Sequence, residues 1–266
     1  MNEKKVVVIT GASRGIGYSV AGLFFKKGYV VYAISRSRCD LDGVKSVICD
    51  ITDEIRLKEA IDSVFLAEKR IDVLINNAGC GISGPVEKTV TDNARKLFEL
   101  NFFAAFEAVK CVVPYMRSRK SGKIINIGSV AGALHVPFQA FYSASKAAIE
   151  ALSNCLRGEL APFGIKITTI LPGDTRTGFT DAREKDFEKD DPDYGERISR
   201  SITLMENDER GGMSAQKVAQ LIYKVACSKN PKPAYVTGVK YNFFVFLNKV
   251  LPKRFVQFVL NMMYAK

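Results

Sequence analysis

The chain has 266 residues, of which 47% are hydrophobic and 25% are charged, the balance of a globular protein that can bury a substantial core. No apolar run approaches the roughly eighteen residues of a transmembrane helix, and the short apolar run near the first residue suits a strand better than a signal peptide. The six cysteines form no CxxC pair and there is one histidine, so the sequence predicts no metal site. We expect reduced thiols, no bound metal and a cytoplasmic protein.

The positive charge is concentrated near the C-terminus. The formal net charge is +11, and the residues from Lys229 to Lys266 include seven basic side chains and no acidic one. Such an excess can serve nucleic acid or a membrane surface. Because the rest of the chain is close to balanced, we expect no nucleic-acid partner and at most a peripheral membrane contact through the C-terminal segment.

Short apolar runs alternate with longer segments of helical periodicity. The predicted strands are Lys5–Thr10, Tyr29–Ser35, Lys45–Cys49, Ile71–Asn76, Lys123–Ser129 and Ile165–Leu171. The predicted helices are Ile16–Lys27, Glu54–Glu68, Thr91–Arg117 and Tyr142–Ala161. Strands that are apolar almost throughout suit a parallel sheet with both faces covered. The pattern predicts an α/β protein: a single doubly wound (Rossmann) domain with a mostly parallel sheet and helices on both faces.

Two stretches break the alternation. Only eight residues lie between Arg36 and Lys45, too few for a helical crossover, so we expect a turn or a short coil. Beyond Pro172-Gly173, the charged stretch Asp174–Gly212 predicts irregular backbone. It is either disordered or a mobile substrate loop, and its place after the end of a strand favours the loop.

The end of the chain completes the predicted organisation. A helix from Ser214 and a short strand at Tyr235–Thr237 follow the charged stretch. We expect residues 1–240, including the loop 174–212, to form one domain. Residues 241–266 form a C-terminal amphipathic extension that we expect to pack on the same domain.

The first predicted strand runs into a glycine-rich turn, TGASRGIG, which contains Gly11, Gly15 and Gly17. Glycines let the backbone approach a pyrophosphate closely, and the N–H groups of a helix N-terminus favour its negative charge. A glycine-rich turn alone is weak support for a nucleotide site. Its position between a strong strand and a helix favours a dinucleotide site.

Further motifs follow that turn in a fixed order. They are Asp50-Ile51 after the third strand, NNAG at Asn76–Gly79, Asn101 within a long helix, Ser129 at the end of the fifth strand, YSASK at Tyr142–Lys146, and Pro172-Gly173. Taken together, the sequence resembles the short-chain dehydrogenases/reductases over almost its whole length. The extension beyond YVTG resembles the hydroxysteroid dehydrogenase-like branch of that family.

The resemblance implies a set of site residues. The catalytic residues would be Tyr142, Lys146, Ser129 and Asn101. The nicotinamide cofactor would contact Gly11, Ser13, Arg14, Gly15, Ile16, Gly17, Ser35, Arg36, Asp50, Ile51, Asn77, Ala78, Gly79, Tyr142, Lys146, Pro172, Gly173, Thr175 and Thr177. The grip of Lys146 on the nicotinamide ribose and the anchoring of a water chain by Asn101 are implied by the resemblance alone.

The chemistry of the tyrosine and the lysine can be argued directly. Tyr142 and Lys146 are four residues apart on a predicted helix and therefore share a face. A nearby ammonium favours the phenolate and can lower the pKa of a tyrosine by roughly 1–3 units from about 10. Tyr142 would then exchange a proton with a substrate oxygen that Ser129 also holds. We expect His135 to line the pocket and Cys80 to be a small packing residue.

The end of the second strand predicts the cofactor. NAD-binding relatives place an acidic residue there for the ribose hydroxyls, whereas this chain has Ser35-Arg36. A serine and a guanidinium suit a 2′-phosphate, and Arg14 matches the family's second basic contact. We therefore expect NADP(H). One departure concerns the nicotinamide end: PGDTRT has Thr175 where the family usually has valine, whereas Thr177 keeps the usual hydroxyl.

Three functions remain open. The favoured one is an NADP(H)-dependent oxidoreductase that transfers a hydride between the nicotinamide and a secondary alcohol or ketone, with a hydroxysteroid or similar lipophilic substrate. The main alternative is a 3-oxoacyl-thioester (acyl-carrier-protein) reductase, since a basic surface suits an acidic carrier. A non-catalytic NADP(H) sensor or scaffold is disfavoured because Tyr142, Lys146 and Ser129 are all present. We expect a homo-oligomer, either a dimer or a tetramer.

The C-terminal segment, Tyr241–Lys266, predicts two short amphipathic helices that are broken near Leu251, because Pro252 disfavours helix at the preceding residue. Its apolar side chains suit packing on the domain or on a second subunit, a lid over a lipophilic substrate, or attachment to an anionic membrane.

Overall fold

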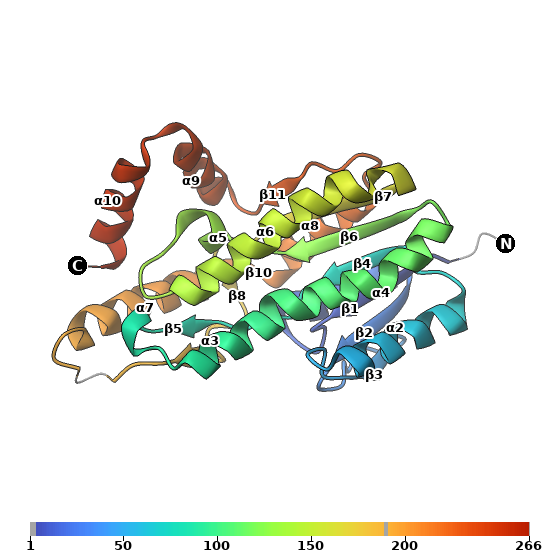
Figure 1. Cartoon of the computed structure of the whole chain (residues 1–266), viewed down its shortest axis with the longest axis horizontal. Coiled ribbons are helices and arrows are strands. Elements are labelled where there is room, and N and C mark those ends of the chain that lie inside the picture. The colour runs from blue at the N-terminus through green and yellow to red at the C-terminus, as the bar shows by residue number, and fades with distance from the viewer. Residues whose placement is uncertain (1–3, 189–190, 266) are drawn as a thin grey trace.

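A parallel sheet of seven strands forms the centre of the protein, whose computed structural model describes residues 4–188 and 191–265 (Figure 1). The strand order is β11-β7-β6-β4-β1-β2-β3, so the order reverses beside β1, as in doubly wound dinucleotide-binding folds. The strands are β1 (Val6–Thr10), β2 (Val30–Ser35), β3 (Lys45–Ile48), β4 (Val73–Asn76), β6 (Gly122–Ile127), β7 (Ile165–Leu171) and β11 (Ala234–Val236). The predicted fold class is confirmed.

Helices lie between the strands and after the last one. They are α1 (Gly15–Lys26), α2 (Glu54–Glu68), α3 (Thr91–Phe98), α4 (Ala104–Ser118), α5 (Ala131–Leu134), α6 (Ala140–Leu160), α7 (Gly195–Arg210), α8 (Ala215–Cys227), α9 (Val239–Val250) and α10 (Lys253–Tyr264). Short 3₁₀ turns lie at Val86–Lys88 and Ala161–Phe163. The connection from Ser35 to Lys45 is made of turns, as its length predicted.

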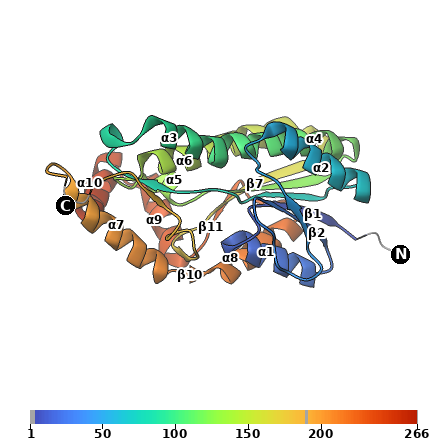
Figure 2. The ribbon, with the colours of Figure 1, turned by 90° about the horizontal axis from the view of Figure 1, so that it is seen from below.

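Alternate residues of each central strand face two separate cores. Val6 and Val8 belong to one apolar cluster and Val7 and Ile9 to the other, and all four are 0% exposed. This follows from the two-residue period of a strand, which sends successive side chains to opposite faces. The first face is covered mainly by α2 and α4 and the second by α1 and α8, as the two helical layers in Figure 2 show.

The predicted helix Thr91–Arg117 contains an irregular turn. Five residues, Glu99–Phe103, adopt a π-helical conformation between α3 and α4. A π-helical turn widens the helix by one residue, and such turns are frequent at functional sites. Here it carries Asn101, which is 2% exposed.

The charged stretch 174–212 is more ordered than its composition indicated. The prediction of irregular backbone was wrong for residues 195–210, which form α7. The reason is a short apolar stripe, because Ile198, Ile202 and Met205 lie on one face of the helix and are at most 5% exposed. Two small parallel pairings hold the flanking backbone: β8 (Thr175–Arg176) with β10 (Met213–Ser214), and β5 (Ile82–Ser83) with β9 (Glu184–Lys185).

The C-terminal residues form the two predicted helices, α9 and α10. Leu251 follows the last residue of α9, and Pro252 is the N-cap of α10. In Figure 1 the two helices form a V beside α5 and α7, where α9 contacts α5 and α10 contacts α7. Among the helices of the described residues, none has the length and apolar character needed to cross a bilayer.

Candidate active site

A cavity of about 760 Å³ opens at the carboxyl ends of the central strands. It is within the usual range for small-molecule sites, about 300–1,000 Å³. Most of the residues singled out from the sequence line it, namely Gly11, Ser13, Arg14, Gly15, Ile16, Ser35, Arg36, Asp50, Ile51, Asn77, Ala78, Gly79, Ser129, Tyr142, Lys146, Pro172, Gly173, Thr175 and Thr177. The other two, Gly17 and Asn101, contact lining residues. His135 is exposed, and its neighbours Leu134 and Val136 line the cavity instead.

The glycine-rich turn has a shape that only glycine permits. Gly11 and Gly15 have φ angles of +68° and +61°, in the left-handed region. A Cβ on Gly11 would lie 2.7 Å from Ala78 Cα, and one on Gly17 would lie 2.5 Å from Asn77 Nδ2. Arg14 is the N-cap of α1 and its side chain does not cap the helix, so the first N–H groups can face an anion. This cradle fits the pyrophosphate of a dinucleotide.

The NNAG segment after β4 holds that turn in place. Asn77 Nδ2 donates hydrogen bonds to the carbonyl oxygens of Thr10 (3.1 Å) and Gly11 (2.9 Å). Thr10 Oγ1 in turn accepts hydrogen bonds from the backbone N–H groups of Asn77 (3.1 Å) and Ala78 (3.2 Å). The ends of β1 and β4 are therefore joined by four polar contacts at the point where the strand order reverses.

A positive corner lies where β2 ends. Arg36 and Arg14 are both exposed and both line the cavity. Ser35 is 6% exposed and its hydroxyl donates to the carbonyl oxygen of Ser37 (2.8 Å). Burial raises the pKa of Asp50, but hydrogen bonds from Thr52 and the positive charge of Arg36 outweigh it, so the pKa lies below its usual value. Arg14 and Arg36 therefore line this corner of the cavity together with one carboxylate, that of Asp50.

The tyrosine, the lysine and the serine meet on one side of the cavity. Tyr142 and Lys146 lie one turn apart on α6, and Lys146 Nζ is 5.8 Å from the centroid of the Tyr142 ring. Lys146 is 5% exposed, and its Nζ donates to the carbonyl oxygen of Ile127 at the end of β6 (3.0 Å). Ser129 is 9% exposed and its Oγ accepts from the backbone N–H of Ala131 (3.1 Å).

Burial sets the proton affinity of this cluster. It raises the pKa of Tyr142 to about 12, although the neighbouring Ser129 opposes the shift, and it lowers the pKa of Lys146 to about 8. The expectation that Lys146 would lower the tyrosine pKa was wrong, because burial is the largest influence on it and Lys146 is not among the groups that oppose the rise. The phenol of Tyr142 is consequently protonated at neutral pH.

Asn101 connects three elements behind the cluster. Its Nδ2 donates to the carbonyl oxygen of Cys80 (3.0 Å) and to Ser145 Oγ (3.1 Å), and its Oδ1 accepts from the backbone N–H of Cys80 (2.9 Å). It therefore ties the NNAG segment to α6. A Cβ on Gly79 would lie 3.0 Å from Asn101 Oδ1 and 3.3 Å from Lys146 Nζ, so a side chain there would press on both groups. The water chain anchored on Asn101 stays a prediction.

The loop after β7 approaches the glycine-rich turn and the C-terminal helices. Thr177 lies over the turn, since a Cβ on Gly15 would be 3.5 Å from Thr177 Cβ. The ring of Tyr241, in α9, packs on Gly173 so closely that a Cβ there would overlap it. Thr175 Oγ1 donates to the carbonyl oxygen of Gly173 (2.7 Å) and so turns its hydroxyl to its own backbone.

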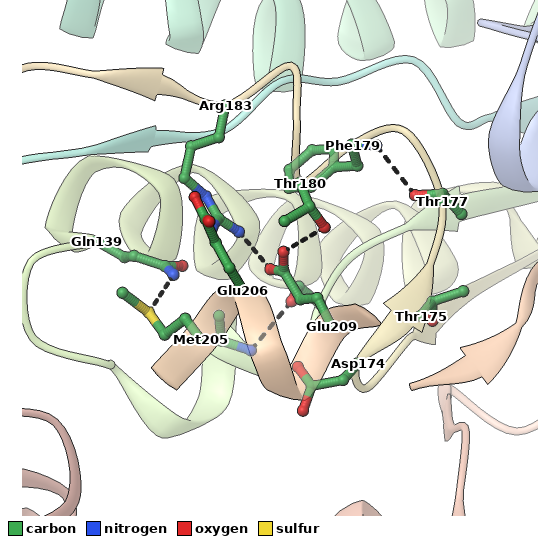
Figure 3. A network of polar contacts seen from close by, with 12 residues as sticks. Gln139, Asp174, Thr175, Thr177, Phe179, Thr180, Arg183, Met205, Glu206 and Glu209 are labelled. Carbon is green, nitrogen blue, oxygen red and sulfur yellow. Dashed lines mark hydrogen bonds and ion pairs between the residues drawn. The ribbon is translucent and has the colours of Figure 1, made fainter. Parts of the chain in front are cut away.

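A polar network that sequence reasoning missed lies at the other end of the cavity. Figure 3 shows Arg183, Thr180 and Glu209 pointing toward one another. Arg183 pairs with Glu209, whose other carboxylate oxygen accepts from Thr180 Oγ1 (2.6 Å). Glu209 lines the cavity, as do Gln139 and Met205, which contact each other. The four-residue spacing of Met205 and Glu209 could have indicated that they share one face of a helix. The many charged residues around them favoured irregular backbone instead.

Comparisons with known proteins decide the family. The sequence profile described as "short chain dehydrogenase" matches residues 5–188. The chain belongs to the short-chain dehydrogenase/reductase family. It is 36% identical over 266 residues to the 3-ketodihydrosphingosine reductase of Bacteroides thetaiotaomicron, covering 99% of each chain.

Two further relatives extend the likeness. The chain is 28% identical over 265 residues to an NADPH-dependent 3-dehydrocapnine reductase of Ornithobacterium rhinotracheale, with 94% of each chain covered. The crystal structure of a short-chain dehydrogenase from Streptomyces avermitilis superposes with a TM-score of 0.85 at 29% identity, covering 98% of this chain and 96% of that one. Members of this family are oxidoreductases, and the named relatives are ketoreductases.

Two of the three glycines of α1, Gly17 and Gly22, provide a matched pair of variants. Gly17→Ala puts a methyl group against the Gly11 carbonyl and Asn77, so we expect NADPH to bind about tenfold more weakly or worse. Gly22→Ala places its Cβ 3.5 Å from a Leu41 methyl carbon, an ordinary contact, and should leave binding unchanged. NADPH fluorescence titration measures both. Equal affinities for the two variants would contradict the assignment of the turn as the pyrophosphate cradle.

Proposed function

We propose that this member of the family is an NADP(H)-dependent reductase that transfers a hydride to the ketone carbonyl of a lipophilic substrate. The observation that carries the proposal is the placement of Tyr142, Ser129 and Lys146 on one cavity that continues between apolar side chains of α9 and α10. The polar cluster suits a carbonyl oxygen, and the apolar part suits a long or bulky alkyl group.

Basic residues support NADP(H) over NAD(H). Arg14 and Arg36 line the end of the cavity beside Ser35, where an acidic residue would repel a 2′-phosphate. A guanidinium can bind a phosphate through two parallel hydrogen bonds. The relative from Ornithobacterium rhinotracheale is named as NADPH-dependent, which agrees with this assignment.

The proposed reaction adds a hydride and a proton to one carbonyl group. When bound, the nicotinamide supplies the hydride to the carbonyl carbon and is oxidised. Tyr142 gives its phenolic proton to the carbonyl oxygen, which Ser129 holds by a hydrogen bond. Lys146, fixed by its hydrogen bond to the Ile127 carbonyl oxygen, would hold the nicotinamide ribose and stabilise the phenolate that forms. The product is a secondary alcohol.

The pKa of Tyr142 supports the reductive direction. At about 12, raised mainly by burial, it keeps the phenol protonated throughout the physiological range. Reduction needs that proton, whereas alcohol oxidation needs the phenolate. The protonated phenol is therefore consistent with a ketone as the substrate at neutral pH.

The C-terminal helices narrow the substrate class. Their side chains Phe244, Leu247, Val256, Leu260 and Met263 line the cavity. The extension alone suggested a hydroxysteroid, but the relatives are named for 3-ketodihydrosphingosine and 3-dehydrocapnine, neither of which is a steroid. We therefore favour a long-chain 3-keto compound of the 3-ketodihydrosphingosine kind, with the acyl-carrier thioester as the second candidate because of the +11 net charge. A non-catalytic NADP(H) sensor would not need the complete cluster.

The two arginines after β2 test the cofactor assignment. Arg36 lines the cavity, whereas Arg38, equally exposed, does not. Loss of a charge-assisted phosphate contact costs about ten- to a hundredfold in affinity. We expect Arg36→Asp to weaken NADPH binding by that factor and to shift preference toward NADH, while Arg38→Asp has little effect. Steady-state kcat/KM with each cofactor measures this, and a wild-type preference for NADH would refute the assignment.

The phenol of Tyr142 tests the chemistry. Tyr142→Phe removes the proton donor and should lower kcat by roughly 10²–10⁴-fold, with NADPH affinity close to wild type. Lys146→Ala should reduce both, since the ammonium acts on the ribose as well as the tyrosine. If Tyr142→Phe retains more than about a tenth of the wild-type kcat, the role of Tyr142 as acid is wrong.

Neighbouring residues of α9 test the substrate class. Leu247 lines the cavity, and Phe246 beside it points outward with 58% exposure. Leu247→Asp should raise KM for a long-chain ketone by about ten- to a hundredfold with little change for a short one, because it puts a carboxylate against the alkyl chain. Phe246→Asp is the control. Equal losses on long and short ketones would contradict an alkyl-binding role for α9, and preferred turnover of acyl-carrier thioesters would favour the second candidate.

A further inference from the structure

The helices α9 and α10 each have a face turned to the protein. On this face Phe244, Leu247 and Val256 line the cavity. Asn248 Nδ2 donates to the carbonyl oxygen of Ala133 in α5 (3.0 Å), and Arg197 in α7 donates to the carbonyl oxygen of Ala265 (2.9 and 3.0 Å). Both helices are thus held against the body of the protein at defined points.

The other face of each helix is a row of exposed apolar side chains, here called the outer rows. They are Phe243, Phe246 and Val250 on α9, and Phe258 and Met262 on α10, none of which lines the cavity. The spacing is i, i+3, i+7 on α9 and i, i+4 on α10, which places the side chains of each row on one side. Phe243, Phe246 and Phe258 are 56%, 58% and 60% exposed.

The outer rows are unusual for the surface of this protein. Nine of the 19 large apolar side chains exposed in the described residues lie between Val239 and Met263. The rest are scattered over the other elements. Isolated exposed apolar residues are normal, whereas a concentration of them indicates an interaction surface.

Basic side chains accompany the outer rows. Lys249, Lys253 and Arg254 are exposed at the end of α9 and the start of α10. The sequence has no acidic residue from Lys229 to Lys266, and the acidic side chains that contact the two helices, Asp174 and Asp208, do so through Tyr241 and Tyr264. Positive charge beside exposed aromatic rings is the composition of a helix that lies in the interface of an anionic membrane.

We propose that the outer rows of α9 and α10 dock on an anionic lipid bilayer, with the aromatic rings among the acyl chains and the basic side chains against the lipid phosphates. A second copy of the chain is the competing occupant. A two-fold contact through this face would bring the basic residues of both copies into one interface, with no acidic residue of the same segment to pair with them, which disfavours it. An anionic surface complements the same charges.

Docking would bring the cavity to the source of an insoluble substrate. The same two helices present the outer rows to the lipid and their opposite faces to the cavity. A long-chain ketone could therefore pass from bilayer to active site along apolar side chains. This last step rests on the proposed function, whereas the docking itself does not.

Sedimentation with vesicles tests the docking directly. We expect the intact protein to co-sediment with vesicles of phosphatidylcholine and phosphatidylglycerol but not with phosphatidylcholine alone. Raising the salt from about 0.1 M to about 1 M should reduce binding, because the Debye length falls from about 10 Å to about 3 Å. Each basic residue near an anionic surface contributes about fivefold in affinity, so Lys249→Gln/Lys253→Gln should weaken binding about 25-fold. Lys217→Gln/Lys224→Gln, which removes two exposed lysines of α8, should leave binding unchanged.

A second variant separates docking from oligomerisation and from turnover. Phe243→Ser/Phe246→Ser/Phe258→Ser should abolish co-sedimentation, while Ile55→Ser/Leu66→Ser, at exposed positions of α2, should not. The turnover of a short, water-soluble ketone reports the proposed function and should be unchanged in all these variants. Absence of binding to anionic vesicles at low salt would overturn the proposal. So would a dimer in sedimentation velocity that the triple phenylalanine variant dissociates, since the outer rows would then be a subunit interface.

Discussion

A single buried ammonium governs the arrangement of the site. Lys146 is 5% exposed, and burial lowers its pKa from 10.5 to about 8, a cost on the order of 3 kcal/mol for the charged form. The surrounding backbone offsets part of this cost. Ile127 ends β6 with its carbonyl oxygen 3.0 Å from Nζ, and Gly79 lacks a side chain that would lie 3.3 Å from the same atom. Gly132 of α5 lets that helix lie against the Lys146 backbone, where a Cβ would be 2.9 Å from the carbonyl carbon.

The same requirement explains why distant motifs occur together. Gly79 must follow β4 without a side chain, and Asn101 fixes the next residue, Cys80, by two backbone hydrogen bonds. The third bond of Asn101, to Ser145, fixes the helix that carries Lys146. A π-helical turn places Asn101 within reach of both partners. The glycine after β4 and the asparagine of the π-helical turn therefore both position the helix that carries Lys146 and Tyr142. The cavity lies on the opposite side of these two side chains.

The sheet and most helices were predictable because their signals are local. Strand residues such as Val6–Ile9 are apolar throughout and buried on both faces, and Pro252 marks the break between α9 and α10. The helix α7 was missed because it has only a short buried stripe, formed by Ile198, Ile202 and Met205. The charged residues around this stripe are more numerous, and charged residues are equally common in irregular, solvent-exposed segments. The pKa shift of Tyr142 was given the wrong sign for a different reason. Spacing shows that an ammonium is one turn away, but the burial that raises the pKa depends on the whole fold.

For the C-terminal helices, sequence periodicity does not show which apolar face packs against the protein. It identified two apolar faces, but which face meets protein is decided by Tyr241, whose ring packs on Gly173 and whose hydroxyl bonds Asp174 in the loop after β7. That contact links α9 to the backbone beside the proposed nicotinamide position. A segment fixed there cannot turn its other face inward as well, so the outer rows remain exposed in the described chain. Packing within the domain therefore covers the cavity-facing side of each C-terminal helix and leaves the outer rows exposed.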